Sequence, residues 1–202
     1  MCIRDRSVSD GDVEIGGIGY GENTMSALPI TFPEVETTSV ELNVNDRCYQ
    51  LALQPRTRLA DALRDHCGLT ATHVGCEQGV CGACTIEVDG APQRSCLQSA
   101  KRFEGRQIRT LEAFDDDPLM AQLRAAFSAE HALQCGYCTP GMLMTARDIV
   151  LRLPDADEAR VAEELAGNLC RCTGYFGIVR AILRVLRERN STVSSQEITH
   201  AA

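Results

Sequence analysis

Hydrophobic and polar residues alternate in the first half of the chain, as they do in β-strands with one buried face. The alternating hydrophobic positions are Val40, Leu42 and Val44, and then Tyr49, Leu51 and Leu53. Asn45-Asp46 between the two runs suits a tight turn, so we predict a β-hairpin here. Thr57 is then the predicted cap of a short helix whose buried face consists of Leu59, Ala62 and Leu63.

A second hairpin is predicted after a glycine-rich loop over residues 75–84. Its strands are Thr85–Val88 and a returning strand that ends at Cys96, and Asp89-Gly90 between them is a strong hairpin turn signal. One further strand is expected at Gln107–Leu111. The first half of the chain is therefore predicted to be rich in β-structure.

The hydrophobic spacing becomes helical after an acidic linker at residues 115–117. Asp117 followed by Pro118 is typical of a helix N-cap with proline at the first helical position. Four helices are predicted: the first has Leu119, Leu123 and Phe127 on its inward face, and the second covers Pro140–Leu153. The third is capped by Pro154-Asp155 and has Val161, Leu165 and Leu169 on its inward face. The fourth covers Tyr175–Arg189, and its inward-facing residues are Ile178, Ile182, Leu183 and Leu186. The chain is predicted to be α+β, with a four-helix half after the β-rich half.

Neither end of the chain shows the hydrophobic spacing of a strand or of a helix. Residues 1–36 are rich in glycine, and we predict a disordered or non-native leader, with Met25 as a plausible natural start. The structured part is predicted to comprise a first domain at 37–113 and a second at 118–190. Residues 191–202 are polar and are expected to form a flexible tail.

Charge and composition narrow the class of protein. The 202 residues include 20 basic and 28 acidic side chains, and this net charge of -8 argues against a nucleic-acid partner. The sequence has neither an apolar run of the roughly 18 to 20 residues that span a membrane nor an apolar secretory signal. We therefore expect a cytoplasmic protein without an integral membrane segment. Its 11 cysteines are an odd number, so metal-binding or catalytic thiolates are favoured over complete disulfide pairing.

Four of these cysteines have the spacing of a plant-type [2Fe–2S] site, C-x4-C-x2-C followed by a fourth cysteine. They are Cys76, Cys81, Cys84 and Cys96. Gly75, Gly79 and Gly82 let the backbone wrap closely and aim N–H groups at an anionic cluster. A zinc site is the alternative, because Cys81-x2-Cys84 alone would suit a zinc knuckle.

A second group of four lies in the helical half. It consists of Cys135, Cys138, Cys170 and Cys172. Both pairs lie at helix boundaries, where free N–H groups and the positive end of the helix dipole lower the pKa of a thiol and stabilise an anionic cluster. Zinc is again the alternative for this group taken alone.

Three segments that carry seven of these eight cysteines resemble the small iron–sulfur subunit of the molybdenum hydroxylases, the family of xanthine dehydrogenase, aldehyde oxidoreductase and carbon monoxide dehydrogenase. The segments are Gly75–Gly90, Gln134–Gly141 and Gly167–Tyr175. The resemblance, which extends from about Ser39 to Arg189, implies a β-grasp plant-type ferredoxin domain followed by an all-α four-helix [2Fe–2S]-binding domain. It also implies that the second group of cysteines holds the cluster nearer the molybdenum. Gln134 would then hydrogen-bond the pterin of a large partner subunit.

The family implies an electron-transfer role without catalytic residues in this chain. Electrons would pass one at a time from the molybdenum–pterin cofactor of the large subunit, through two [2Fe–2S] clusters, to FAD in a medium subunit. A free-standing ferredoxin-like carrier and a zinc-stabilised interaction module are the rival functions. The sequence departs from the family pattern where glycine is common, at Ala71, Glu77 and Ala113.

The remaining cysteines and the histidines are expected to have lesser roles. Cys48 and Cys67 are interpreted as packing residues, and Cys2 lies in the leader. The histidines His66, His73, His131 and His200 show no metal-ligand spacing among themselves. His73 is expected to lie near the first cysteine loop without binding metal.

Overall fold

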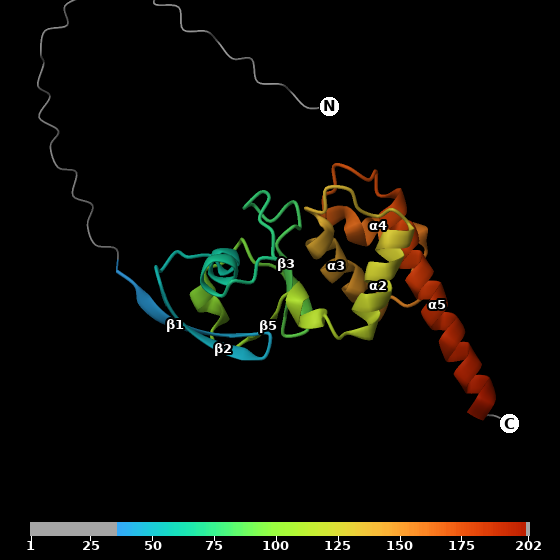
Figure 1. Ribbon diagram of the computed structural model, residues 1–202, viewed down its shortest axis with the longest axis horizontal. Coiled ribbons are helices and arrows are strands. Elements are labelled where there is room, and N and C mark those ends of the chain that lie inside the picture. Colours follow the sequence, from blue (N-terminus) through green and yellow to red (C-terminus); the bar gives the residue numbers. More distant parts are fainter. Residues whose placement is uncertain (1–35, 201–202) are drawn as a thin grey trace, which may run out of the picture. The chain divides into compact units, whose positions relative to one another are not determined.

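The computed structural model of the protein describes residues 36–200. Our expectations for the leader, for Met25 and for Cys2 lie outside the described residues. The described elements, in chain order, are β1 (Thr38–Val44), β2 (Arg47–Leu53), α1 (Leu59–Asp61), a π-helical turn (Ala62–His66), β3 (Thr85–Val88), β4 (Ala91–Arg94), a 3-10 turn (Ala100–Phe103), β5 (Gln107–Arg109), a 3-10 turn (Leu111–Phe114), α2 (Pro118–Ala129), α3 (Thr139–Arg152), α4 (Glu158–Glu164), a 3-10 turn (Leu165–Gly167) and α5 (Phe176–His200). The chain is thus α+β (Figure 1).

The strands form one mixed five-stranded sheet in the order β2-β1-β5-β3-β4. Both predicted hairpins are present as antiparallel pairs, whereas β1 and β5 pair in parallel. The turn residues Asn45 and Asp46 have φ of 51° and 60°, and Asp89 and Gly90 have 49° and 81°. These left-handed backbones match the twist of the strands and confirm both turns.

The short helix after β2 begins one residue later than predicted. Its N-cap is Arg58, which makes no side-chain capping bond, so the prediction for Thr57 is wrong. The backbone carbonyl of Thr57 instead accepts a hydrogen bond from the N–H of Ala100. The predicted buried face is confirmed, because Leu59, Ala62 and Leu63 are fully buried against the sheet.

The helical half contains four α-helices in the predicted order. Asp117 caps α2 by accepting a hydrogen bond from the N–H of Met120 at 2.8 Å. The cap of α4 is Asp157 rather than Asp155, because a backbone bond from Ala156 to Leu153 closes a turn first. The last helix continues to His200, beyond the predicted end at Arg189.

Leu169, which we predicted to face inward on this third helix of the second half, lies beyond the end of α4 and on the surface. Helix α4 ends at Glu164, and a 3-10 turn follows at Leu165–Gly167. The chain then leaves the helical direction, and Leu169 is 51% exposed. The described helices include none that is both long and apolar enough to cross a membrane.

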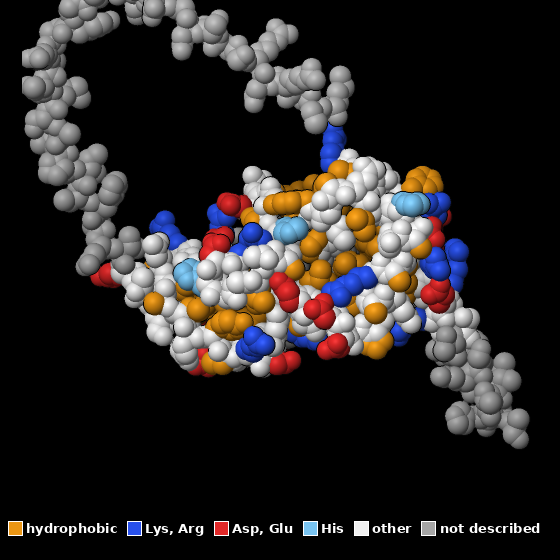
Figure 2. All heavy atoms as spheres, viewed as in Figure 1, with side chains coloured by type: hydrophobic (Ala, Val, Ile, Leu, Met, Phe, Trp, Pro, Cys, Tyr) orange, Lys and Arg blue, Asp and Glu red, His pale blue; other side chains and the backbone are white. Residues whose placement is uncertain are grey.

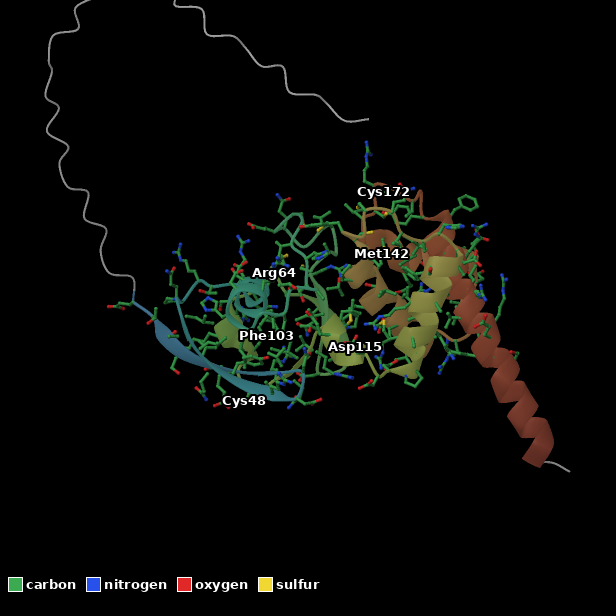
Figure 3. The ribbon with its side chains drawn as sticks, viewed as in Figure 1. Cys48, Arg64, Phe103, Asp115, Met142 and Cys172 are labelled. Atoms are coloured by element: carbon green, nitrogen blue, oxygen red, sulfur yellow. The ribbon has the colours of Figure 1, made fainter. Side chains whose placement is uncertain are left out.

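Two large hydrophobic cores form around these elements, and a small third cluster consists of Ala60, Cys84 and Cys96. We call residues 38–109 the sheet half, with Phe103 in its core, and residues 118–200 the helical half, with Met142 in its core (Figure 3). Helix α3 packs against β3 and β4. At this junction a Cβ atom on Gly141 would lie 2.2 Å from the carbonyl oxygen of Gly82, so only glycine permits so close an approach.

Candidate metal centres

The first four cysteines come together at one end of the β3–β4 hairpin. We call them the sheet-half site: Cys76, Cys81, Cys84 and Cys96. Cys84 and Cys96 are 2% and 3% exposed and lie at the two open ends of the hairpin. Ser95 joins these ends, since its N–H and its hydroxyl both donate to the carbonyl of Cys84, at 3.2 and 2.9 Å.

The glycine-rich loop supplies backbone N–H groups to the sulfur of Cys76. The N–H groups of Gln78 and Cys81 both donate to its Sγ at 3.4 Å. These bonds, that of Cys81 foremost, lower the pKa of the Cys76 thiol to about 6. Burial has the opposite effect at Cys96 and raises its pKa to about 11. The loop therefore favours negative charge on the sulfur of Cys76.

Three residues of this loop have left-handed backbones. Two are Gly79 and Gly82, with φ of 77° and 72°. The third is Glu77, with φ of 55°, at a position where the family pattern commonly has glycine. Its carboxylate forms an ion pair with Arg58 at 2.5 Å.

The second four cysteines lie where α3 and α5 begin. We call them the helical-half site: Cys135, Cys138, Cys170 and Cys172. Cys138 is the N-cap of α3, and Cys135 is exposed. Figure 3 shows Cys172 on the loop that leads into α5. Although a helix N-terminus was expected to lower thiol pKa values, burial raises the pKa of Cys138 to about 12.

Within each site the thiols associate in pairs. The pairs are Cys76 with Cys81, Cys84 with Cys96, Cys138 with Cys170, and Cys135 with Cys172, whose Sγ atoms are 3.6 Å apart. In the described part of the chain, no group of three or more His, Cys, Asp or Glu side chains is arranged to hold a metal ion. Two pairs of thiols match a two-iron cluster, in which each iron takes two cysteine ligands.

A buried hydroxyl beside Cys138 supports the same fit. The Oγ1 atom of Thr139 is buried and has no hydrogen-bond partner among the described residues. A buried polar atom normally has a partner, so a group with acceptor sulfur atoms at this site would satisfy it. The donor set and the pairing of the thiols therefore fit [2Fe–2S] clusters.

A backbone hydrogen bond joins the two sites directly. The N–H of Leu169, next to the ligand candidate Cys170, donates to the carbonyl of Cys81 at 2.8 Å. This bond accounts for the outward position of Leu169. The two cysteine loops are thus in contact, although nearly 90 residues separate them in the sequence.

Asn168 stabilises this junction from a buried position, with only 2% of its surface exposed. Its amide donates to the carbonyls of Gly82 and Gly141 at 3.3 and 3.1 Å. Its Oδ1 accepts from Arg94 at 3.2 Å and from Thr145 at 3.0 Å. One side chain therefore connects the sheet-half loop, β4 and α3.

Tyr137 and His73 form a second contact between the loops. Their rings stack with centroids 4.7 Å apart. The Tyr137 hydroxyl donates to the carbonyl of Val74 at 2.7 Å, and His73 Nδ1 lies 2.8 Å from the Tyr137 carbonyl. The His73 ring thus packs on the cysteine loop of the helical half. It also lies near the sheet-half site, as expected. Sequence reasoning missed Asn168 and Tyr137 as contact residues, although both lie within the family-like segments.

The other residues singled out in the sequence differ in their exposure. Gln134 is exposed beside Cys135. Cys48 is exposed on β2, so its interpretation as a packing residue is wrong: the alternation of β2 turns it away from the core (Figure 3). Cys67 is partly buried, and burial raises its pKa to about 11. His66 and His131 are exposed.

Comparison with known proteins identifies two domain types. Residues 44–124 match a family described as a 2Fe-2S iron-sulfur cluster binding domain, and residues 110–183 match a [2Fe-2S] binding domain. The chain is 50% identical over 149 residues to caffeine dehydrogenase subunit gamma of Pseudomonas sp. (strain CBB1), covering 72% of this chain and 89% of that one. The small subunit of nicotine 6-hydroxylase from Paenarthrobacter nicotinovorans is 48% identical, covering 73% and 89%.

Among solved structures, quinoline 2-oxidoreductase from Pseudomonas putida 86 is similar, with a TM-score of 0.71. It is 46% identical, over 76% of this chain and 95% of that one. This chain belongs to the family of iron–sulfur small subunits of the molybdenum hydroxylases. Members of this family are non-catalytic electron-transfer subunits of oxidoreductase complexes, so this chain works with other subunits and [2Fe–2S] is its cofactor. The expected cytoplasmic location stays a prediction.

Proposed function

We propose that this chain holds two [2Fe–2S] clusters and relays electrons one at a time from a molybdenum–pterin centre in a large subunit to FAD in a medium subunit. The helical-half site is the first to receive an electron and the sheet-half site is the second. A bound [2Fe–2S] cluster supplies one-electron transfer with little rearrangement of its ligands. Residues 37–113 are proposed as a β-grasp ferredoxin domain, and 118–190 as the helical [2Fe–2S]-binding domain.

The contact between the two cysteine loops is the observation that carries this proposal. The bond from the Leu169 N–H to the Cys81 carbonyl links one ligand loop to the other. From the sulfur of Cys81 to that of Cys170, the path consists of covalent bonds and this single 2.8 Å hydrogen bond. This contact offers electrons a short route between the two proposed cluster sites.

Exposed side chains around the sites support contacts with other subunits. Six large hydrophobic residues with 41–73% exposure lie on or beside the cysteine loops: Val80, Leu97, Leu133, Tyr137, Leu169 and Phe176. Figure 2 shows hydrophobic side chains exposed among charged ones on the face in view. Burying such residues is favourable in an interface. We propose that Gln134, beside the exposed Cys135, meets the pterin of the large subunit.

Metal analysis and reduction of the intact complex test this proposal. We expect about four irons and four labile sulfides per chain, and two distinguishable EPR signals after reduction. The chain should co-purify with a large and a medium subunit, and substrate added to the complex should reduce both clusters. Caffeine, nicotine and quinoline form a suitable first panel, because similar chains belong to enzymes named for these compounds.

Two results would favour the rival functions. Stoichiometric zinc in a colourless protein would identify a zinc-stabilised interaction module. Purification without partners, with both clusters reduced only by an unrelated reductase, would identify a free-standing carrier.

A further inference from the structure

The loop that carries Cys170 and Cys172 is held in place by its own side chains. The Tyr175 hydroxyl reaches back to accept a hydrogen bond from the N–H of Cys170 at 2.9 Å. It donates in turn to the carbonyl of Asn168 at 3.1 Å. The phenol therefore pins the backbone on both sides of Leu169, next to the junction with the sheet-half site.

This arrangement requires unfavourable backbone angles. Gly174 and Tyr175 both have left-handed conformations, with φ of 63° and 68°. Glycine adopts such angles freely, whereas a tyrosine does so only at a cost in free energy. The two hydrogen bonds of the phenol offset this cost. The loop is thus held in one conformation by interactions that are specific to it.

The same conformation orients the hydroxyl of Thr173. The N–H of Tyr175 donates to Thr173 Oγ1 at 3.2 Å, and the hydroxyl donates to Cys170 Sγ, also at 3.2 Å. A hydroxyl has only one proton to donate. Because the Tyr175 N–H occupies a lone pair of this oxygen, the proton is directed at the sulfur.

No equivalent contact exists among the described residues of the sheet-half site. Thr85 follows Cys84 there, but its hydroxyl donates to the carbonyl of Gly82 at 2.5 Å. The donors to sulfur at that site are backbone N–H groups, such as those of Gln78 and Cys81, and neighbouring thiols. Donation by a hydroxyl to a candidate ligand sulfur therefore distinguishes the helical-half site.

We propose that Thr173 is a positioning residue that raises the reduction potential of the helical-half cluster through its hydrogen bond to Cys170. This inference rests on the proposed function, since it assigns Cys170 as a ligand. Reduction adds one negative charge to the cluster, and a hydrogen bond to a ligand sulfur stabilises the more negative state. The hydroxyl thus makes this cluster easier to reduce and favours its role as first acceptor.

The test is an EPR-monitored redox titration of the complex with Thr173→Val, which keeps the branched shape and removes the hydroxyl. The midpoint potential of the helical-half cluster should become more negative, whereas that of the sheet-half cluster should not change. Thr173→Ser should restore the wild-type potential. Thr145→Val is the matched control, because it removes a hydroxyl that donates to Asn168 rather than to sulfur; both potentials should stay the same.

Several outcomes would overturn the inference while leaving the proposed function intact. One is an unchanged potential in Thr173→Val with both clusters present. A second is a Thr173→Ser shift as large as that of Thr173→Val, and a third is loss of the helical-half cluster, which would assign the hydroxyl to assembly. A wild-type chain with fewer than two EPR signals would instead refute the proposed function itself.

Discussion

The two cysteine sites each bring four cysteines together, but they do so with different local structures. The sheet-half site takes its proposed ligands from a glycine-rich loop and the two ends of a hairpin, and Cys84 and Cys96 are buried. The helical-half site takes its proposed ligands from the starts of two helices, and Cys135 is exposed. The first site therefore depends on the sheet core, whereas the second depends on side-chain hydrogen bonds within its loops.

The largest expected effect comes from replacing one candidate ligand at each site in turn. Cys84→Ser should remove the sheet-half EPR signal, and Cys135→Ser the helical-half signal, with iron falling from about four to about two per chain in each case. Cys84→Ser should also lower the thermal midpoint of the chain more, because its side chain lies in the core. Cys48→Ser is the control and should keep all iron, since Cys48 is exposed on β2. If either ligand variant lost both signals, the two sites would not be independent.

Next in size is the junction that both sites share. Asn168→Ala leaves the carbonyls of Gly82 and Gly141 without a side-chain donor, and we expect a loss of about 2–4 kcal/mol in the free energy of unfolding. Urea unfolding followed by circular dichroism measures it. Asn190→Ala is the matched control, because Asn190 makes one exposed bond to the carbonyl of Pro154; its effect should stay within about 0.5 kcal/mol. Equal effects of the two variants would contradict this account of Asn168.

A smaller effect compares Glu77 and Tyr175, the left-handed non-glycine residues of the two cysteine loops. Tyr175→Gly should lower the free energy of unfolding by about 2 kcal/mol, because the two hydrogen bonds of the phenol are lost. Glu77→Gly should raise it by about 0.5–1 kcal/mol, since it relieves the backbone and loses only an exposed ion pair. Thermal melts of both variants would show opposite signs. The same sign for both would mean that the side chains do not differ in this way.

The smallest effect concerns pH at the contact between the halves. Asp117 lies against Arg147 at 2.8 Å, and Arg147 also pairs with Glu87 of β3 at 3.1 Å. The pKa of Asp117 is lowered, because hydrogen bonds from Met120 and Arg147 outweigh its burial. Its contribution is therefore fully present above the unfolded-state pKa of about 3.9 and is lost as pH falls through the lower folded-state pKa.

Asp117→Asn tests this dependence, since asparagine also caps helices. The variant should be less stable than wild type by about 1 kcal/mol at pH 7, and the difference should vanish in acid below the folded-state pKa. Urea midpoints over this range measure the difference. A constant difference between pH 7 and pH 2 would exclude the carboxylate charge as its cause.

Local patterns predicted most of the fold. Turn residues such as Asn45 and Asp89 act within a few positions, and Asp117 with Pro118 forms a helix start that depends only on its neighbours. The misplaced ends of α4 show where this reasoning fails. Its path after Glu164 is determined by Cys81, far away in the sequence, because the Leu169 N–H bonds there.

The candidate sites show the same division. Spacing drew attention to the eight cysteines, because most of them lie within a few positions of another cysteine. The roles of Asn168 and Thr173 could not be read from spacing, since one depends on a contact across 86 positions and the other on the left-handed backbone of Tyr175. The resemblance marked the segment Gly167–Tyr175 that contains both residues but did not assign a partner to either.

The close packing of Gly82 on Gly141 has a consequence for protein engineering. Each half of this chain matches its own domain type, which invites the exchange of one half for that of a relative. Such a chimera must bring a glycine, an asparagine and a carbonyl from different parents into register within a fraction of an ångström. We therefore expect transplanted halves to work only when the residues equivalent to 82, 141 and 168 are transferred together, so the two domains are inherited as one module.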